Sequence, residues 1–275
     1  MYYVLPFSPW PIVARVLGIG VPISLILGIV KGQWIITLII LRLVTIVALV
    51  WLFDLVKEWS RGSRTSGEVK NYRKGFLLFI VSEALLFFRF FWTFFHRSLA
   101  PTQQLGCQWP PIGIVPIELG IPLLNTGLLL LSGVSLTWSH HAYIQGKRKE
   151  GNVGLIVTIA LGFIFFSFQV FEYLNRSFRF ADRVFGRIFF LATGFHGAHV
   201  VAGALLLSGV LYLILSSPVP RGGPLFFELA AWYWHFVDVV WLFLFICVYW
   251  WGSLTKVNDI FSWFSKAIER KNSCV

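Results

Sequence analysis

The chain has 275 residues, of which 57% are hydrophobic and 13% are charged. A soluble domain carries about 25% charged residues, so a water-soluble globular protein is excluded. The net charge of +11 would suit nucleic-acid binding, but the basic residues gather between apolar runs, where loops meet anionic lipid head groups. The composition predicts a membrane protein with no nucleic-acid partner.

Seven apolar runs follow one another, each long enough for the roughly 20 residues that a membrane-spanning helix needs. The runs cover about residues 11–30, 34–56, 75–96, 121–140, 153–175, 185–215 and 226–252. The ten-residue alternation of barrel strands is absent from the sequence. We therefore expect an all-α integral membrane protein with seven transmembrane helices.

A polar stretch from Glu58 to Lys74 separates the first two helices from the other five. It predicts a two-helix plus five-helix arrangement. We expect residues 1–65 to hold helices one and two with the following connection, residues 66–252 a five-helix bundle, and residues 253–275 a C-terminal extension. The extension suits either an amphipathic helix or a solvated tail. Lys and Arg divide evenly between the two sides, so the positive-inside rule does not orient the chain.

Charged residues within the apolar runs are the first candidates for function. Glu83 follows about eight apolar residues, and a carboxylate in hydrocarbon should face protein rather than lipid. It is either part of a proton relay or a protonated group bonded to a neighbouring helix. Asp238 and Glu172 are the other carboxylates of this kind. Arg89 lies about 240° around the helix from Glu83, so we expect it to snorkel, to pair with another subunit, or to meet Asp238 or Glu172.

The histidines do not form a metal-binding pattern. A metal site needs three or four convergent ligands, and no cysteine or carboxylate pattern completes one, so neither metal nor haem is expected in this chain. We expect polar helix-packing roles for His140, His141, His196, His199, His235 and Glu228. Glu228 also suits the positive end of a helix dipole. Trp232-Tyr233-Trp234 and Trp250-Trp251 bracket the seventh helix, as membrane-interface anchors do.

Several segments, read together, resemble subunit III of the haem-copper cytochrome c oxidases. The strongest are Ala192-Thr193-Gly194-Phe195-His196-Gly197-Ala198-His199-Val200 and Trp232-Tyr233-Trp234-His235-Phe236-Val237-Asp238-Val239-Val240-Trp241-Leu242-Phe243. Weaker matches lie at residues 8–11, 54–58, 82–88, 90–92, 98–101, 109–114, 123–126, 132–141 and 169–173. They keep the family's order over about residues 8–252.

The resemblance implies an accessory core subunit without a redox centre, whose oxidase is a proton-translocating enzyme of the aerobic respiratory chain. Haem and copper would belong to partner subunits, and catalytic subunit I would be a direct partner. The family role is support of assembly, sustained turnover and proton uptake. The resemblance also implies phospholipids in a cleft between helices 1–2 and 3–7, with the N-terminus on the matrix side. The implied location is the mitochondrial inner membrane, with the bacterial plasma membrane as the alternative.

The resemblance places lipid contacts at the cleft residues Trp51, Glu58, Arg64 and Arg221. Family members commonly have a His where Arg64 stands and an Arg where Leu213 stands, so Arg64 or Arg221 would substitute for them. Three other interpretations stay open: subunit III of a quinol oxidase, whose members typically have only five helices; an independent seven-helix transporter or receptor; and a haem-binding oxidoreductase.

Overall fold

The computed structural model describes residues 8–60, 66–101, 109, 111, 120–176, 178–180, 182–216 and 225–252, without the side chains of 52–53, 55–60, 66 and 183. Its helices are α1 Trp10–Lys31, α2 Trp34–Ser60, α3 Ser66–Leu99, α4 Gly120–Ile144, α5 Arg148–Leu174, α6 Arg183–Ser216 and α7 Leu225–Leu244, which the π-helix η2 Phe245–Trp251 continues. The described residues contain no strand, and they hold seven stretches long and apolar enough to cross a membrane. The predicted all-α, seven-helix membrane fold is confirmed.

The chain divides into two compact units, Met1–Tyr72 and Arg73–Val275, consistent with the predicted two-plus-five grouping. The described residues of the polar stretch are helical, since α2 continues to Ser60 and α3 begins at Ser66. α3 thus begins nine residues before the predicted span. The helix therefore extends beyond the apolar run into polar residues. The predicted extension at 253–275 lies outside the described residues.

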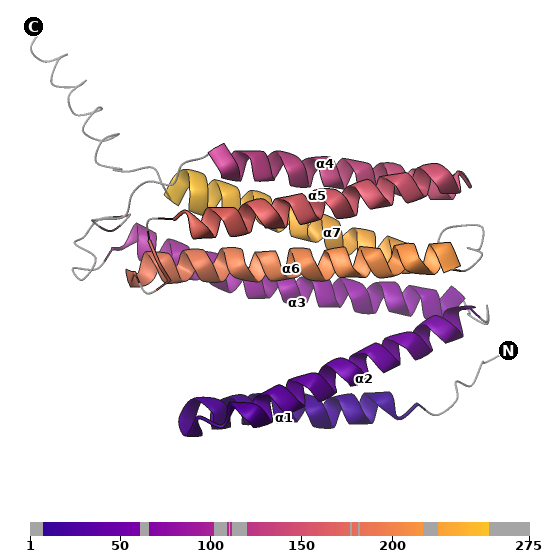
Figure 1. Ribbon diagram of the computed structural model, residues 1–275, viewed down its shortest axis with the longest axis horizontal. Helices are drawn as coiled ribbons and strands as arrows, with labels where there is room; N and C mark the ends of the chain where they lie inside the picture. The colour runs from indigo at the N-terminus through magenta and orange to yellow at the C-terminus, as the bar shows by residue number, and fades with distance from the viewer. Residues whose placement is uncertain are drawn as a thin grey trace, which may run out of the picture. The chain divides into compact units, whose positions relative to one another are not determined.

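In the first unit, α1 and α2 form an antiparallel hairpin (Figure 1). Gly32 ends α1 with a φ of 70°, a left-handed conformation that glycine adopts without steric cost. Near this turn Thr37 Oγ1 donates to the Ser24 carbonyl oxygen at 2.8 Å. At the open end of the hairpin, Trp10 Nε1 donates to Asp54 Oδ2 at 2.7 Å. These polar contacts join two largely apolar helices at both ends of the hairpin.

In the second unit, α4 packs on α5, α5 on α6, α6 on α7 and α7 on α4, so the four helices close a ring (Figure 1). Small residues let α5 approach α4 closely. A Cβ added at Gly154 would lie 2.9 Å from Ser139 Cβ and 3.0 Å from the Ser135 carbonyl oxygen. Close backbone approach over small residues is typical of membrane helix pairs.

Large side chains of α7 fill the space between the four helices. Trp234 and Trp241 are fully buried, and their indole nitrogens donate to Ser132 Oγ at 2.9 Å and to Thr126 Oγ1 at 3.0 Å on α4. The predicted anchor role at the start of α7 is therefore wrong for Trp234 and for Tyr233, which is also buried. The pattern misled because a tryptophan suits a membrane interface and a hydrogen-bonded core position equally well.

α3 contacts the four helices through large aromatic side chains rather than through close approach of the backbones. Phe87 meets Phe236 with ring centroids 6.3 Å apart, and Phe91 meets Phe243 at 6.2 Å. Only 6% of the apolar window of α3 is buried, against 33–50% in α4 to α7. Most of the circumference of α3 is therefore available to lipid or to other protein.

Candidate functional site

A carboxylate–histidine pair joins α3 to α6. Glu83 Oε2 lies 2.9 Å from His199 Nε2, and the two side chains are 22% and 13% exposed. The other ring nitrogen of His199, Nδ1, lies 2.7 Å from the carbonyl oxygen of Phe195, one turn earlier on α6. The Glu83 carboxylate thus contacts another helix of the same unit, and His199 belongs to one of the two strongest family-like segments.

The hydrogen bonds of His199 restrict where its protons reside. A carbonyl oxygen only accepts, so Nδ1 of His199 carries a proton. The remaining proton of the pair then lies on Nε2 or on the Glu83 carboxyl group, and the pair has no net charge in either case. A low-dielectric environment favours such a neutral pair over an isolated charge.

Aromatic rings cover the pair. The Phe87 ring meets the His199 imidazole edge-on with centroids 5.0 Å apart, and the Tyr233 ring stacks on it at 6.3 Å. These rings come from α3 and α7, so three helices shape the environment of one imidazole. The arrangement orients the histidine and lowers the local dielectric around the shared proton.

A second polar cluster lies where α5 ends. The buried carboxylate of Glu172 accepts a hydrogen bond from Arg176, four residues later, and another from the Tyr249 hydroxyl at 3.4 Å. Gln169 Nε2 donates to the same Tyr249 hydroxyl at 3.3 Å. The Arg176 guanidinium also lies 5.6 Å from the centre of the Phe189 ring. This cluster joins α5 to η2 and places a cation at the negative end of the α5 dipole.

Asp238 lies between α7 and α4. Its Oδ2 is 3.9 Å from His235 Nδ1 on the same helix. A Cβ added at Gly133 of α4 would lie only 2.8 Å from this oxygen, so the absence of a side chain at Gly133 admits the carboxyl group. The other oxygen, Oδ1, is buried without a hydrogen-bond partner among the described residues.

The remaining histidines pack against aromatic rings. His196 is buried between the rings of Phe165 and Trp241, with centroids 5.7 Å and 5.2 Å away, and neither of its nitrogens is hydrogen-bonded within the described part of the chain. His140 stacks on Phe227 at 5.4 Å, and His141, 6.1 Å from His140, is exposed near the end of α4. Across the residues with described positions, no three His, Cys, Asp or Glu side chains converge as metal ligands would.

Two basic residues of α3 differ in their partners. Arg73 pairs with Glu228 of α7 at 2.7 Å, so Glu228 joins two helices in addition to lying in the first turn of α7. Arg89 is exposed. In the described part of the chain, neither carboxylate proposed for Arg89 pairs with it. Glu172 pairs with Arg176, and Asp238 faces His235.

Most of the side chains predicted to line the lipid cleft lie outside the part of the chain that the structure describes. Arg64, Arg221 and the side chain of Glu58 are not among the described atoms, and Trp51 is half-buried on α2. The cleft therefore remains a prediction.

Sequence reasoning missed three contacts that position these sites. The Glu172–Arg176 pair was visible in the sequence as an i,i+4 spacing, which brings side chains together on a helix. The Arg73–Glu228 pair and the approach of Gly133 to Asp238 join residues far apart in the chain. No local pattern marks such pairs, because they depend on which helices become neighbours.

Comparison with known proteins agrees with this architecture. The family model for cytochrome c oxidase subunit III matches residues 1–253. The chain is 46% identical over 250 residues to cytochrome c oxidase subunit 3 of Branchiostoma lanceolatum, covering 90% of this chain and 95% of the relative. It is 44% identical to that of Paracentrotus lividus and 45% identical to that of Struthio camelus, each over 92% of this chain and 97% of the relative. The chain belongs to the cytochrome c oxidase subunit III family.

Proposed function

We propose that this chain is the accessory, non-redox subunit III of a proton-pumping cytochrome c oxidase in the mitochondrial inner membrane. It would pack against catalytic subunit I, whose assembly, sustained turnover and proton uptake it would support, while haem and copper belong to partner subunits. The observation that carries the proposal is the family match over residues 1–253. The relatives compared are named for cytochrome c oxidase, which favours this enzyme over the quinol oxidase and over an independent transporter.

The geometry supports a scaffold role. Glu83 with His199 joins α3 to α6, and Arg73 with Glu228 joins α3 to α7, so in each pair groups of compensating charge lie side by side between packed helices. Such pairs fix the register of helices in a membrane at little cost in net charge. The helix-packing role proposed for the remaining polar residues rests on other contacts. His140 and His196 pack against aromatic rings, His141 lies beside His140, His235 faces Asp238, and Glu228 pairs with Arg73.

We retain Glu83, Asp238 and Glu172 as candidates for proton exchange with the catalytic subunit. They lie on α3, α7 and α5, and the distances described here do not join them into one chain of hydrogen bonds. The Glu83 pair is the best candidate, since it holds a proton between two groups at 2.9 Å.

We also retain the phospholipid cleft, with Trp51, Glu58, Arg64 and Arg221 as its contacts. Arg64 and Arg221 would hold the lipid phosphate, to which guanidinium groups bind with two parallel hydrogen bonds. Native mass spectrometry of the purified oxidase would report the lipids lost when both arginines are replaced by methionine. Retention of every lipid would contradict this assignment.

Replacing Glu83 by glutamine in the assembled oxidase tests the accessory role. Glutamine keeps the size and one carbonyl oxygen but cannot share a proton with His199. We expect an unchanged rate of haem reduction and a shorter period of turnover before activity is lost. The matched control is Glu150→Gln, which makes the same chemical change at a half-exposed position at the start of α5.

The two variants distinguish the accessory role from a redox role. Loss of haem reduction in Glu83→Gln, with the chain still present in the complex, would contradict the proposal. An equal loss of sustained turnover in Glu150→Gln would show that the effect does not come from the α3–α6 pair.

A further inference from the structure

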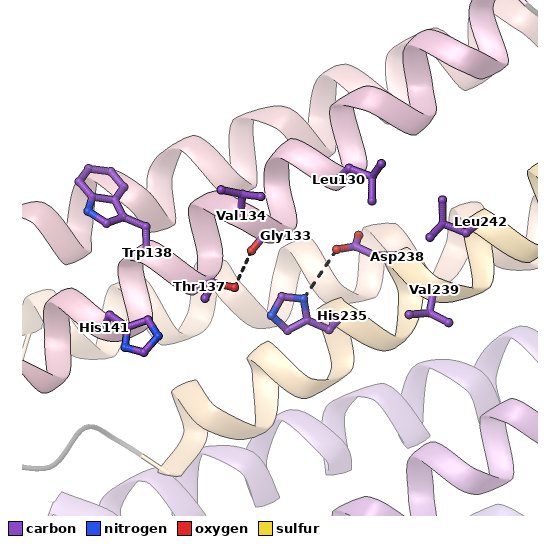
Figure 2. Close-up of a pocket in the computed structure, with 10 residues that line it drawn as sticks. All are labelled: Leu130, Gly133, Val134, Thr137, Trp138, His141, His235, Asp238, Val239 and Leu242. Atoms are coloured by element: carbon purple, nitrogen blue, oxygen red, sulfur yellow. Dashed lines mark hydrogen bonds and ion pairs between the residues drawn. The ribbon is translucent and has the colours of Figure 1, made fainter.

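A groove on the surface of the second unit has on its floor a carboxyl group, that of Asp238, to which no described residue donates a hydrogen bond. It lies between α4 and α7 and encloses about 560 Å³ (Figure 2). It is lined by Leu130, Gly133, Val134, Thr137, Trp138, His141, His235, Asp238, Val239 and Leu242. We call this the α4–α7 groove.

The walls of the groove are apolar and open to the membrane. Val134 is 66% exposed, and Leu130, Trp138 and Val239 are 46–49% exposed. The lining residues of α4 recur along one face from Leu130 to His141, a length of roughly 16 Å at 1.5 Å per residue. The groove therefore runs parallel to α4 and α7, and a partner helix could lie along it.

The floor of the groove holds Asp238. Its residue surface is only 7% exposed, and its carboxyl group points into the space between the two helices (Figure 2). Oδ2 faces His235 Nδ1 at 3.9 Å, which is beyond hydrogen-bond distance, and Oδ1 has no partner within the described residues. Oδ1 is enclosed, whereas Oδ2 faces Gly133 of α4. A buried carboxyl group with so few donors is costly, and Oδ2 is the oxygen at which a donor entering the groove would meet it.

Depth in the membrane decides which occupant can supply that donor. Asp238 is thirteen residues from each end of the span Leu225–Trp251, so about 20 Å of helix separates it from either end. The hydrocarbon core is about 30 Å thick, so Asp238 lies near its middle. A phospholipid would offer only an acyl chain at this depth, because its polar groups lie at the surface.

We propose that the α4–α7 groove receives a transmembrane helix of another oxidase subunit, and that a hydroxyl, amide or ammonium group of that helix donates to Asp238. This inference rests on the proposed function, which supplies neighbouring subunits. A polar side chain at mid-membrane depth is stabilised by such an interhelical bond. The glycine at position 133 suits this role, because it leaves the carboxyl group accessible from the groove.

A photo-crosslinking amino acid at Val134 of the purified, haem-bearing oxidase tests the occupant. The matched control carries the same label at Leu205, which is 64% exposed on α6. We expect the Val134 label to attach to one transmembrane helix of another subunit, within one turn of a donor side chain. Attachment to lipid or detergent alone would overturn the inference.

Variants of Asp238 test the hydrogen bond. Asp238→Leu removes both acceptors, and we expect roughly threefold to fifteenfold lower crosslinking at Val134 with no change at Leu205, the range measured for interhelical hydrogen bonds in membranes. Asp238→Asn keeps one carbonyl oxygen and should retain most of the yield. Equal yields in Asp238→Leu and the unmodified chain would overturn the proposed bond.

A second variant avoids the buried carboxyl group in case Asp238→Leu does not fold. Val134→Trp fills the groove from its exposed rim and should remove the partner subunit, whereas Leu205→Trp should leave it in place. Retention of every subunit in Val134→Trp would contradict the inference. Absence of this chain from the haem-bearing complex would instead refute the proposed function, and with it the groove's partner.

Discussion

Gly162 of α5 gives the sharpest test of packing in the ring. A Cβ added there would lie 2.6 Å from Cη2 and 3.1 Å from Cζ2 of the Trp234 indole. Non-bonded carbon atoms prefer about 3.5–4.0 Å, so the nearer contact falls short by roughly 1 Å. We predict that Gly162→Ala destabilises the ring although alanine is the better helix former.

The indole of Trp234 has no room to retreat. On another side, a Cβ at Gly203 would lie 2.9 Å from Trp234 Cε3, and the indole nitrogen is held by Ser132 at 2.9 Å. Overpacking of this kind costs about 1–3 kcal/mol, and the gain in helix propensity returns up to about 1 kcal/mol. Because the shortfall is about 1 Å and the indole is held on both sides, the upper part of that range, about 2–3 kcal/mol, applies. The expected net loss is then about 1–2 kcal/mol, or roughly 2–8 °C for a unit of this size.

The assay is thermal denaturation of the purified oxidase, followed by the fraction of this chain that remains soluble. Gly209→Ala on α6 is the matched control, because no described atom beyond the neighbouring backbone of its own helix lies within 4 Å of a Cβ added there. It should be neutral or slightly stabilising. A midpoint for Gly162→Ala equal to that of Gly209→Ala would refute the packing argument.

A double variant identifies the clash directly. Phenylalanine at position 234 lacks the outer part of the indole that carries Cη2 and Cζ2, so Gly162→Ala should cost little when Trp234→Phe is also present. The coupling between the two changes should be of the same size as the single-variant loss, since residues in contact are non-additive. Additive effects would place the cost of Gly162→Ala elsewhere.

Three further predictions use the same thermal assay. Ser132→Ala leaves the buried Trp234 indole nitrogen without its acceptor, so we expect a loss of about 1–3 kcal/mol, and an unchanged midpoint would contradict the hydrogen bond. The Arg73–Glu228 pair is partly exposed, and a double-mutant cycle should give a salt-sensitive coupling below about 1 kcal/mol; a salt-insensitive coupling of about 2 kcal/mol would contradict this. Gly32→Ala forces a side chain into a φ of 70° and should cost about 1 kcal/mol, whereas a stabilised variant would show that the turn relaxes.

Hydropathy predicted the seven helices well because lipid requires each span to be apolar and to satisfy its own backbone. It placed the end of the third span near residue 96, close to Leu99, but missed the helical start at Ser66. Residues 66–74 are polar, so the signal that finds membrane helices fails where a helix continues into water. Boundaries outside the membrane depend on capping and packing instead.

The sequence indicated which residues were candidates for the site, but it did not indicate which of them would be in contact. The cost of a carboxylate in hydrocarbon singled out Glu83, but nothing in its neighbourhood named His199, which is 116 positions away. The tryptophans of α7 show the opposite failure. Their sequence pattern suited the membrane interface, and only the position of Ser132 on the opposing helix shows that Trp234 belongs in the core.

The contrast between α3 and α5 has a mechanical consequence. α5 meets α4 at Gly154, where even an added Cβ would lie within 3.0 Å of Ser139 Cβ and the Ser135 carbonyl oxygen, so no flexible side chain separates the two helices there. α3 meets its neighbours through rings such as Phe87 and Phe91, which can tilt about their side-chain bonds and absorb a comparable displacement. A push on the exposed side of α3 would thus be damped within one layer of phenylalanines, while the same push on α5 would be transmitted across the ring. The contacts of α3 are therefore the more deformable ones in this unit, and the contacts among α4, α5, α6 and α7 are the more rigid ones.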